Sequence, residues 1–353
     1  MSGGDSGTGG GGEAAPAFSV VIPVFNGSGY LARAIESALA QELPPLEVIV
    51  VDDGSTDGSA GVADSFGPPV RCVRQENAGP AAARNRGVAV SAAASGWVAF
   101  LDHDDLWEPG YLREAASYLA GHPAAGVVCF GARVLAEGGE PTPHILLKRT
   151  PGAVYSTRGM LEGDVGTIMT PVVRKDLFLS VSGFDPALRG GEDCDLWLRL
   201  SLVTEIHQVR LPLLLYRKHE TNTSWNVLMT AEHSLLSLEK LGREHPQFLG
   251  EHGEAFRKMR GKQYLRLGRE LLYREHASPE SVRRARAALA AAVADRPDLW
   301  RARFYSFVAL LPGGAAAFAR WRRRELALRG WQTESRAAAF FRHLRRRRRG
   351  TSA

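Results

Sequence analysis

The chain has few cysteines and no long apolar segment. Its 353 residues include three cysteines, Cys72, Cys129 and Cys194, and no CxxC pair. This odd, widely spaced set argues against a disulfide framework or a zinc site and fits a reducing cytosol. The nearest candidate for a membrane span, residues 304–319, is shorter than the ~18–20 apolar residues that cross a bilayer and contains a Pro-Gly-Gly interruption. We therefore expect no membrane-spanning helix.

The two ends of the chain also lack the features of a folded core. Residues 1–16 are rich in glycine and serine without an apolar h-region, which predicts a disordered tail rather than a signal peptide. The net charge of +6 is concentrated in Arg342 and residues 345–349, so the rest of the chain is close to neutral. No nucleic-acid partner is expected. The basic tail either contacts anionic lipid or is a solvated end.

The remaining composition, 44% hydrophobic and 23% charged, is typical of a soluble globular protein. Strand-like segments at 18–25, 46–51 and 97–101 alternate with helix-like segments at 30–40 and 81–94. Such alternation favours an α/β fold, a mostly parallel sheet flanked by helices, with ligands at the carboxyl ends of the strands.

The pattern changes near residue 226, where strand signals stop and Ala, Leu, Arg and Glu dominate. Before that point, residues 136–160 show no regular pattern. We therefore predict four parts in sequence: a disordered tail at 1–16, an α/β domain at 17–226, a helical region at 227–341 and a basic disordered tail at 342–353.

Acidic residues follow two of the predicted strands. The cluster Asp102-His103-Asp104-Asp105 comes directly after one, and Asp52-Asp53 after another. Carboxylates at a strand end can hold Mg²⁺ or Mn²⁺, which prefer hard oxygen ligands and the phosphate oxygens of a substrate. The alternative is that the acids are solvated turn residues or caps of the next helix.

Six segments occur in a fixed order along the first 224 residues: Pro23 to Asn26, Asp52 to Asp57, Asn77 to Gly87, Asp102 to Asp105, Gly191 to Trp197 and Tyr216 to His219. This series resembles the family 2 inverting glycosyltransferases of bacterial cell-envelope and exopolysaccharide synthesis. The resemblance implies a GT-A fold, which binds a nucleotide-sugar donor.

The resemblance also implies how the donor is bound. Asp53 would contact the nucleotide base, with Asp52 beside it, because a carboxylate suits the N–H edge of uracil. A UDP-linked donor is therefore expected. Pro23 and Phe25 would form a wall of the base pocket, although plain core packing is an alternative for both.

The other donor contacts implied by the resemblance lie in the third and fourth segments. Asn77, Gly79 and Arg84 are expected at the nucleotide-sugar site, with Arg84 near the nucleotide or its phosphates. The alternative for Arg84 is an exposed helical arginine. Asp102 would lie toward the ribose.

The resemblance implies a divalent cation, Mn²⁺ or Mg²⁺. Asp104 matches the metal ligand of the Asp-x-Asp motif, with Asp102 as a second candidate ligand and Asp105 orienting them. His219 matches a histidine that ligates metal or phosphate after the last strand, and a surface histidine is the alternative. No role is predicted for His103.

Glu192 and Asp193 match the Glu-Asp motif, in which the Asp is the catalytic base. Inverting transfer needs one such base within hydrogen-bond reach of the acceptor hydroxyl. The alternative is favourable helix N-terminal charge, which is the interpretation preferred for Asp195.

These implications together predict a metal-assisted, inverting transferase that acts on a carbohydrate or lipid-linked acceptor. It would be cytoplasmic, with possible peripheral contact at the inner face of the plasma membrane. Two alternatives are a sugar-phosphate nucleotidyltransferase and a catalytically silent nucleotide-sugar-binding protein. The nucleotidyltransferase class would be expected to carry a Gly-rich, basic loop after the first strand, where this chain has Pro23-Val24-Phe25-Asn26.

Overall fold

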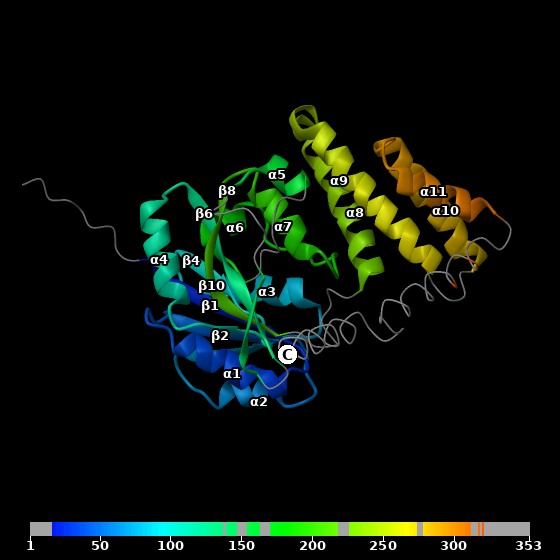
Figure 1. The fold of residues 1–353 in the computed structure, drawn as a ribbon. Coiled ribbons are helices and arrows are strands. Elements are labelled where there is room, and N and C mark those ends of the chain that lie inside the picture. The colour runs from blue at the N-terminus through cyan, green and yellow to red at the C-terminus, as the bar shows by residue number, and fades with distance from the viewer. Residues whose placement is uncertain are drawn as a thin grey trace, which may run out of the picture.

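The computed structural model describes residues 16–136, 139–146, 154–162, 170–217, 226–273 and 278–311, together with residues 317 and 320. These residues form a ten-stranded sheet flanked by helices and then a helical region (Figure 1). The basic tail 342–353, nearly all of the N-terminal tail and His219 lie outside the described residues.

The element bounds follow the chain. The strands are β1 (Phe18–Val24), β2 (Glu47–Asp52), β3 (Val70–Arg74), β4 (Trp97–Phe100), β5 (Leu106–Trp107), β6 (Ala125–Leu135), β7 (Pro141–Leu146), β8 (Val154–Tyr155), β9 (Val172–Arg174) and β10 (Glu205–Arg217). The helices are α1 (Ser28–Leu39), α2 (Ser59–Asp64), α3 (Pro80–Ala89), α4 (Tyr111–Gly121), α5 (Thr157–Glu162), α6 (Lys175–Ser180), α7 (Glu192–Leu200), α8 (Val227–Glu244), α9 (Pro246–Tyr273), α10 (Pro279–Asp295) and α11 (Trp300–Leu310).

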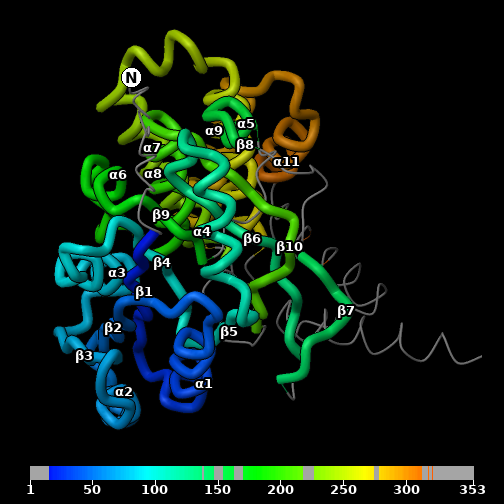
Figure 2. Tube along the Cα trace, turned by 90° about the vertical axis from the view of Figure 1, so that its left-hand side faces the viewer, coloured from blue at the N-terminus to red at the C-terminus, as the bar shows by residue number. Residues whose placement is uncertain are grey.

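The sheet has the strand order β3-β2-β1-β4-β9-β6-β10-β5, with β7 beside β6 and β8 beside β10 (Figure 2). The first half, β3 to β4, is parallel throughout. Val24 is paired with Asp52, so β1 and β2 end at the same level. The predicted α/β fold is confirmed. Beyond β4 the sheet is mixed, because β9 runs antiparallel to both β4 and β6.

Alternation along the buried strands gives the sheet two apolar faces. In β1, Val20 and Ile22 pack with α1 and α4, whereas Val21 packs with α3 on the opposite face. Successive strand residues point to opposite faces, so a strand covered on both sides is apolar at every position. This explains why β1 is buried along its whole length.

Residues 136–160 are more regular than their sequence predicts. The expectation of an irregular segment is wrong in part, since β7 and β8 add to the sheet at β6 and β10. β7 is exposed at most of its positions and β8 has two residues. Exposed or very short strands have no alternating apolar pattern, so periodicity could not reveal them.

The helical region begins at Val227, and its two halves pack differently. Leu238 of α8 and Phe256 of α9 belong to the same apolar cluster as α3 and α7. Leu289 of α10 and Val308 of α11 lie in a separate, smaller cluster with the end of α9. In the part of the chain that the structure describes, no helix is long and apolar enough to cross a membrane.

Candidate functional site

Two turns at the carboxyl edge of the sheet are joined by side-chain hydrogen bonds. After β1, the Asn26 backbone N–H donates to Ser55 Oγ at 3.0 Å, and Asn26 Oδ1 accepts from the Thr56 N–H at 2.8 Å. Within the second turn, Asp52 Oδ1 accepts from the Ser55 N–H at 3.0 Å. Asp52 therefore stabilises this turn, and its place beside the nucleotide base stays a prediction.

Asp53 is buried and supports the loop that carries the third motif. One carboxylate oxygen accepts from Gln75 Nε2 at 2.7 Å and from the Ala78 N–H at 2.9 Å, and the other accepts from the Gly79 N–H at 2.8 Å. Gly79 has a φ of +91° and immediately precedes α3. Asp53 thus fixes the backbone of this loop, on which Asn77 is exposed.

Of the two residues predicted to form a wall of the base pocket, one is buried and the other is exposed. Pro23 is buried within β1, whereas the Phe25 side chain is 48% exposed. Core packing therefore does not explain Phe25. Nearby, the His103 ring lies against Gly27, where an added Cβ would approach His103 Cδ2 to 2.1 Å. Glycine at this position permits that close approach.

Arg84 joins two motifs that are far apart in the sequence. From α3, its guanidinium contacts Asp102 Oδ1 at 2.7 Å and Glu192 Oε1 at 3.2 Å, and it lies 5.4 Å from the centre of the Phe184 ring. The side chain is only 14% exposed, so the alternative of an exposed helical arginine is wrong. Burial opposes its charge, but the two carboxylates raise the pKa of Arg84 above its ordinary value.

In the acidic turn after β4, Asp105 is buried, whereas Asp102 and Asp104 are half-buried. Asp105 Oδ1 accepts from the Arg217 N–H at 2.8 Å. Burial, followed by the charges of Asp104 and Asp102, raises the pKa of the Asp105 carboxyl well above its ordinary value. Arg217 Nε also donates to the Asp104 carbonyl at 3.0 Å. These contacts attach the end of β10 to the turn.

The residues present fit a divalent cation that shares its coordination with a substrate. Asp104 is half-buried, and the Asp102 side chain is 42% exposed with one oxygen paired to Arg84. Among the described residues, no group of three or more His, Cys, Asp and Glu side chains could hold a metal alone. One or two carboxylates completed by phosphate oxygens and water is the usual arrangement for Mg²⁺. His219, outside the described part, stays a prediction.

Asp193 lies in the first turn of α7, beside Glu192. Gly191 precedes the helix with a φ of +76°, a conformation that glycine adopts readily. Asp193 Oδ1 accepts from the Cys194 N–H at 2.7 Å. Burial raises the pKa of Asp193, and the Cys194 hydrogen bond and the charge of Arg84 oppose the shift. Burial likewise raises the pKa of Glu192 against the effect of Arg84.

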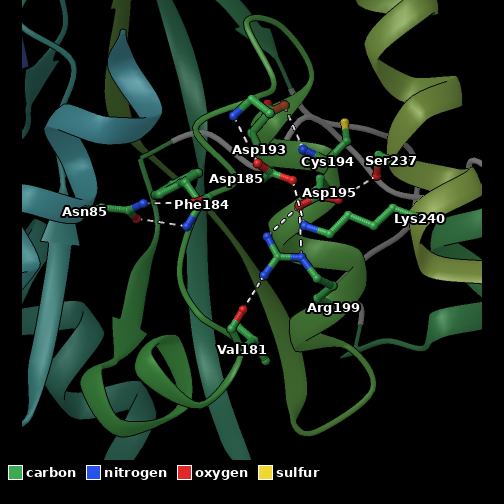
Figure 3. Close-up of polar contacts among 11 residues, drawn as sticks. Asn85, Val181, Phe184, Asp185, Asp193, Cys194, Asp195, Arg199, Ser237 and Lys240 are labelled. Carbon is green, nitrogen blue, oxygen red and sulfur yellow. Dashed lines mark hydrogen bonds and ion pairs between the residues drawn. The ribbon is translucent and has the colours of Figure 1, made fainter. Parts of the chain in front are cut away.

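Polar side chains on α8, among them Ser237 and Lys240 in Figure 3, hold the segment that contains Asp193. His233 Nδ1 accepts from the Arg189 N–H at 2.7 Å. Ser237 Oγ donates to Asp195 Oδ1 at 2.7 Å, and Lys240 Nζ pairs with Asp185 Oδ2 at 2.7 Å. These α8 residues are four and three positions apart, which places them on one face of the helix.

Asp195 has a larger structural role than helix N-terminal charge. Besides accepting from Ser237, it is buried and pairs with Arg199 at 2.5 Å. Arg199 also donates to the Val181 carbonyl at 2.5 Å (Figure 3). The contribution of α8 is not among the contacts predicted from the sequence. A signal was present, because Ser234 and Ser237 lie among the buried leucines of that helix, where hydroxyls need partners.

Comparison with known proteins identifies relatives of the α/β region. A family model described as glycosyl transferase family 2 matches residues 19–171. The chain is 30% identical over 227 residues to an uncharacterised glycosyltransferase of Rickettsia typhi, covering 60% of this chain and 68% of the relative. It is 38% identical over 195 residues to the succinoglycan biosynthesis protein ExoU of Rhizobium meliloti, covering 51% and 55%. For another relative, from Rickettsia bellii, the match spans only 31% of its length.

Solved structures show the same fold at low sequence identity. TarS of S. aureus, residues 1–349 in complex with UDP-GlcNAc, has a TM-score of 0.57 at 18% identity, covering 88% of this chain and 92% of that chain. The mannosyltransferase PcManGT of Pyrobaculum calidifontis, in complex with GDP-Man and Mn²⁺, has a TM-score of 0.53 at 18% identity, with 88% of each chain covered. The protein belongs to glycosyl transferase family 2 and has the GT-A fold.

Proposed function

We propose that the protein transfers a sugar from a nucleotide-sugar donor, UDP-linked, to an acceptor hydroxyl with inversion at the anomeric carbon. The observation that carries this proposal is the Arg84 bridge, which connects Asp102 of the acidic turn to Glu192 beside Asp193. The donor-side acids and the candidate base therefore border one site. The complex of TarS with UDP-GlcNAc supports the choice of UDP.

Residues on the donor side would bind and orient the nucleotide diphosphate. Asp104, with Asp102, would hold Mn²⁺ or Mg²⁺, and the bound cation would neutralise charge on the leaving diphosphate. The complex of PcManGT with Mn²⁺ and GDP-Man supports this assignment. Phe25, which is exposed directly after β1, and the loop fixed by Asp53 would border the base.

Asp193 would act as the general base. Its carboxylate takes the proton of the acceptor hydroxyl while that oxygen attacks the anomeric carbon. The bond from the anomeric carbon to the diphosphate oxygen breaks, and its electron pair leaves with the nucleoside diphosphate. Attack opposite the leaving group inverts the configuration. Burial raises the pKa of Asp193, which makes its carboxylate a stronger proton acceptor than an exposed aspartate.

The acceptor would be a carbohydrate or a lipid-linked intermediate of envelope polysaccharide. The relative named for succinoglycan biosynthesis supports this class. Peripheral membrane contact through the basic tail 342–353 is part of the same proposal.

The test is a screen of nucleotide sugars with Mn²⁺ that measures donor binding and donor turnover separately. We expect Asp193→Asn to reduce transfer by about 10²–10⁴-fold with donor affinity unchanged, because general-base catalysis contributes a factor of that size. Asp176→Asn is a matched control, since Asp176 lies in the first turn of α6 on the surface. Normal transfer by Asp193→Asn would contradict the base assignment.

Two other outcomes would favour the alternatives. Release of pyrophosphate from a nucleoside triphosphate would indicate a sugar-phosphate nucleotidyltransferase. A catalytically silent binding protein would bind the donor but would neither hydrolyse it nor transfer its sugar to any carbohydrate or lipid-linked acceptor.

A further inference from the structure

Helix α11 exposes an apolar face to solvent. The exposed fractions are 67% for Trp300, 46% for Phe304, 61% for Phe307, 64% for Leu310 and 44% for Leu311. Residues four and seven positions after Trp300 fall on one side of a helix, so Phe304 and Phe307 share a face with Trp300. Leu310 ends the helix and Leu311 directly follows it. We call these five residues the α11 stripe.

The opposite side of α11 already has its own packing. Ala302, Val308 and Ala309 are buried, and the last two belong to the small cluster with Leu271 and Leu289 of α9 and α10. The helix is therefore apolar on its outer side as well as its inner side. A helix with large apolar residues on two sides is normally covered on both of them. α11 lies in the half of the helical region farther from the sheet (Figure 1), so the sheet domain does not cover the stripe.

The charged residues of α11 are both arginines, and Asp298, which precedes the helix, is already paired with Arg296. Arg301 and Arg303 are exposed beside the stripe, and neither forms an ion pair with an acid among the described residues. Residues 299–353 contain 14 arginines against two acidic residues, Glu325 and Glu334. The whole chain has a net charge of +6, so the residues before this segment carry a net negative charge.

A second copy of the chain, the following segment 312–341 or an anionic lipid surface could cover the stripe. The positive charge disfavours the first two. A second copy related by two-fold symmetry would place the arginines of one α11 near those of the other, because such an interface uses the same patch on both chains. The following segment 312–341 is itself rich in arginine and would also add positive charge beside Arg301 and Arg303.

We propose that the α11 stripe docks on an anionic lipid surface. Trp, Phe and Leu would enter the boundary between headgroups and acyl chains, while Arg301 and Arg303 remain with the lipid phosphates. Aromatic and aliphatic residues flanked by arginine are the composition of helices that lie in a membrane interface. The arginine-rich chain that follows would add attraction to the same surface. Docking of the stripe extends the membrane contact proposed for the basic tail 342–353 and does not depend on the transfer reaction.

The experiment is flotation of the full chain with vesicles of phosphatidylcholine alone and of an equimolar mixture with phosphatidylglycerol. We expect binding only to the anionic vesicles, with a decrease at high salt. The variant Phe304→Ser/Phe307→Ser should bind about tenfold or more weakly, because two large apolar side chains no longer leave water. The matched control is Leu179→Ser/Val203→Ser, which removes two apolar side chains that are 55% and 53% exposed elsewhere.

Three results would overturn the proposal. Equal binding by Phe304→Ser/Phe307→Ser and the wild type would show that the stripe does not contact lipid. Self-association of the wild type without lipid, lost in this variant, together with no flotation, would assign the stripe to a second copy. A large loss of thermal stability in this variant but not in its control, again without flotation, would show that the chain covers its own stripe.

Discussion

The proposed donor side and the proposed base side of the site are supported by different parts of the chain. On the donor side, Asp53 is held by groups of residues 75–79, and the acidic turn is held by Arg84 and Arg217. On the base side, the segment around Asp193 is held by α8, about 40–55 residues later in the chain. Changes on one side should therefore alter donor binding, and changes on the other should alter turnover.

Arg84 connects the two sides, so its loss should have the largest effect. In Arg84→Met, the carboxylates of Asp102 and Glu192 lose their common partner. We expect a loss of about 3 kcal/mol in the free energy of unfolding, since removing one partner of a buried ion pair strands the other. Both donor binding and transfer should fall. Urea denaturation and a donor titration measure these effects.

The control for this change is Arg84→Lys, which keeps the charge but cannot contact both acids through a planar fork. The free energy of unfolding, the donor affinity and the transfer rate of Arg84→Lys should lie between those of the wild type and of Arg84→Met. The positive charge of Arg84 opposes the rise in the pKa of Asp193 that burial causes. Loss of Arg84 should therefore raise this pKa further and move the acid limb of kcat/KM to higher pH. An unchanged acid limb in Arg84→Met would mean that Asp193 is not the titrating base.

A change at Asp53 should affect the donor side alone. In Asp53→Asn, the side chain loses its charge, and one carboxylate oxygen is replaced by an NH₂ group. This group is itself a donor, so it cannot accept from the N–H group that Asp53 binds at that position. We expect a loss of about 2 kcal/mol in the free energy of unfolding and weaker donor binding, because a buried donor is left without an acceptor. Turnover of bound donor should change little. Asp64→Asn is the control, since the Asp64 side chain is 53% exposed. Equal stabilities of the two variants would contradict the support role of Asp53.

The same division explains what the sequence could predict. The acidic turns follow short buried strands, and the turn residues Asp52 and Gly79 satisfy local backbone requirements, so the donor side is encoded within each motif. The Ser237–Asp195 contact joins residues 42 positions apart, and no local pattern specifies which serine of a helix meets which acid. The sequence pattern did not predict β9 for a related reason. This strand is three residues long, and its place between β4 and β6 depends on the whole sheet.

Ser237→Ala should have the smallest effect and should act on turnover alone. Asp195 keeps its pair with Arg199, so the loss in the free energy of unfolding should be about 1 kcal/mol, the net contribution of one hydrogen bond. The start of α7 loses one of its attachments to α8. We therefore expect kcat to fall by a few fold while donor affinity stays the same, because the donor-side contacts are untouched. Ser237→Thr, which can donate the same hydrogen bond, should restore kcat. Leu236→Ala, at an exposed position of the same helix, is the neutral control. If Ser237→Ala weakened donor binding as much as turnover, the two sides of the site would not be supported separately.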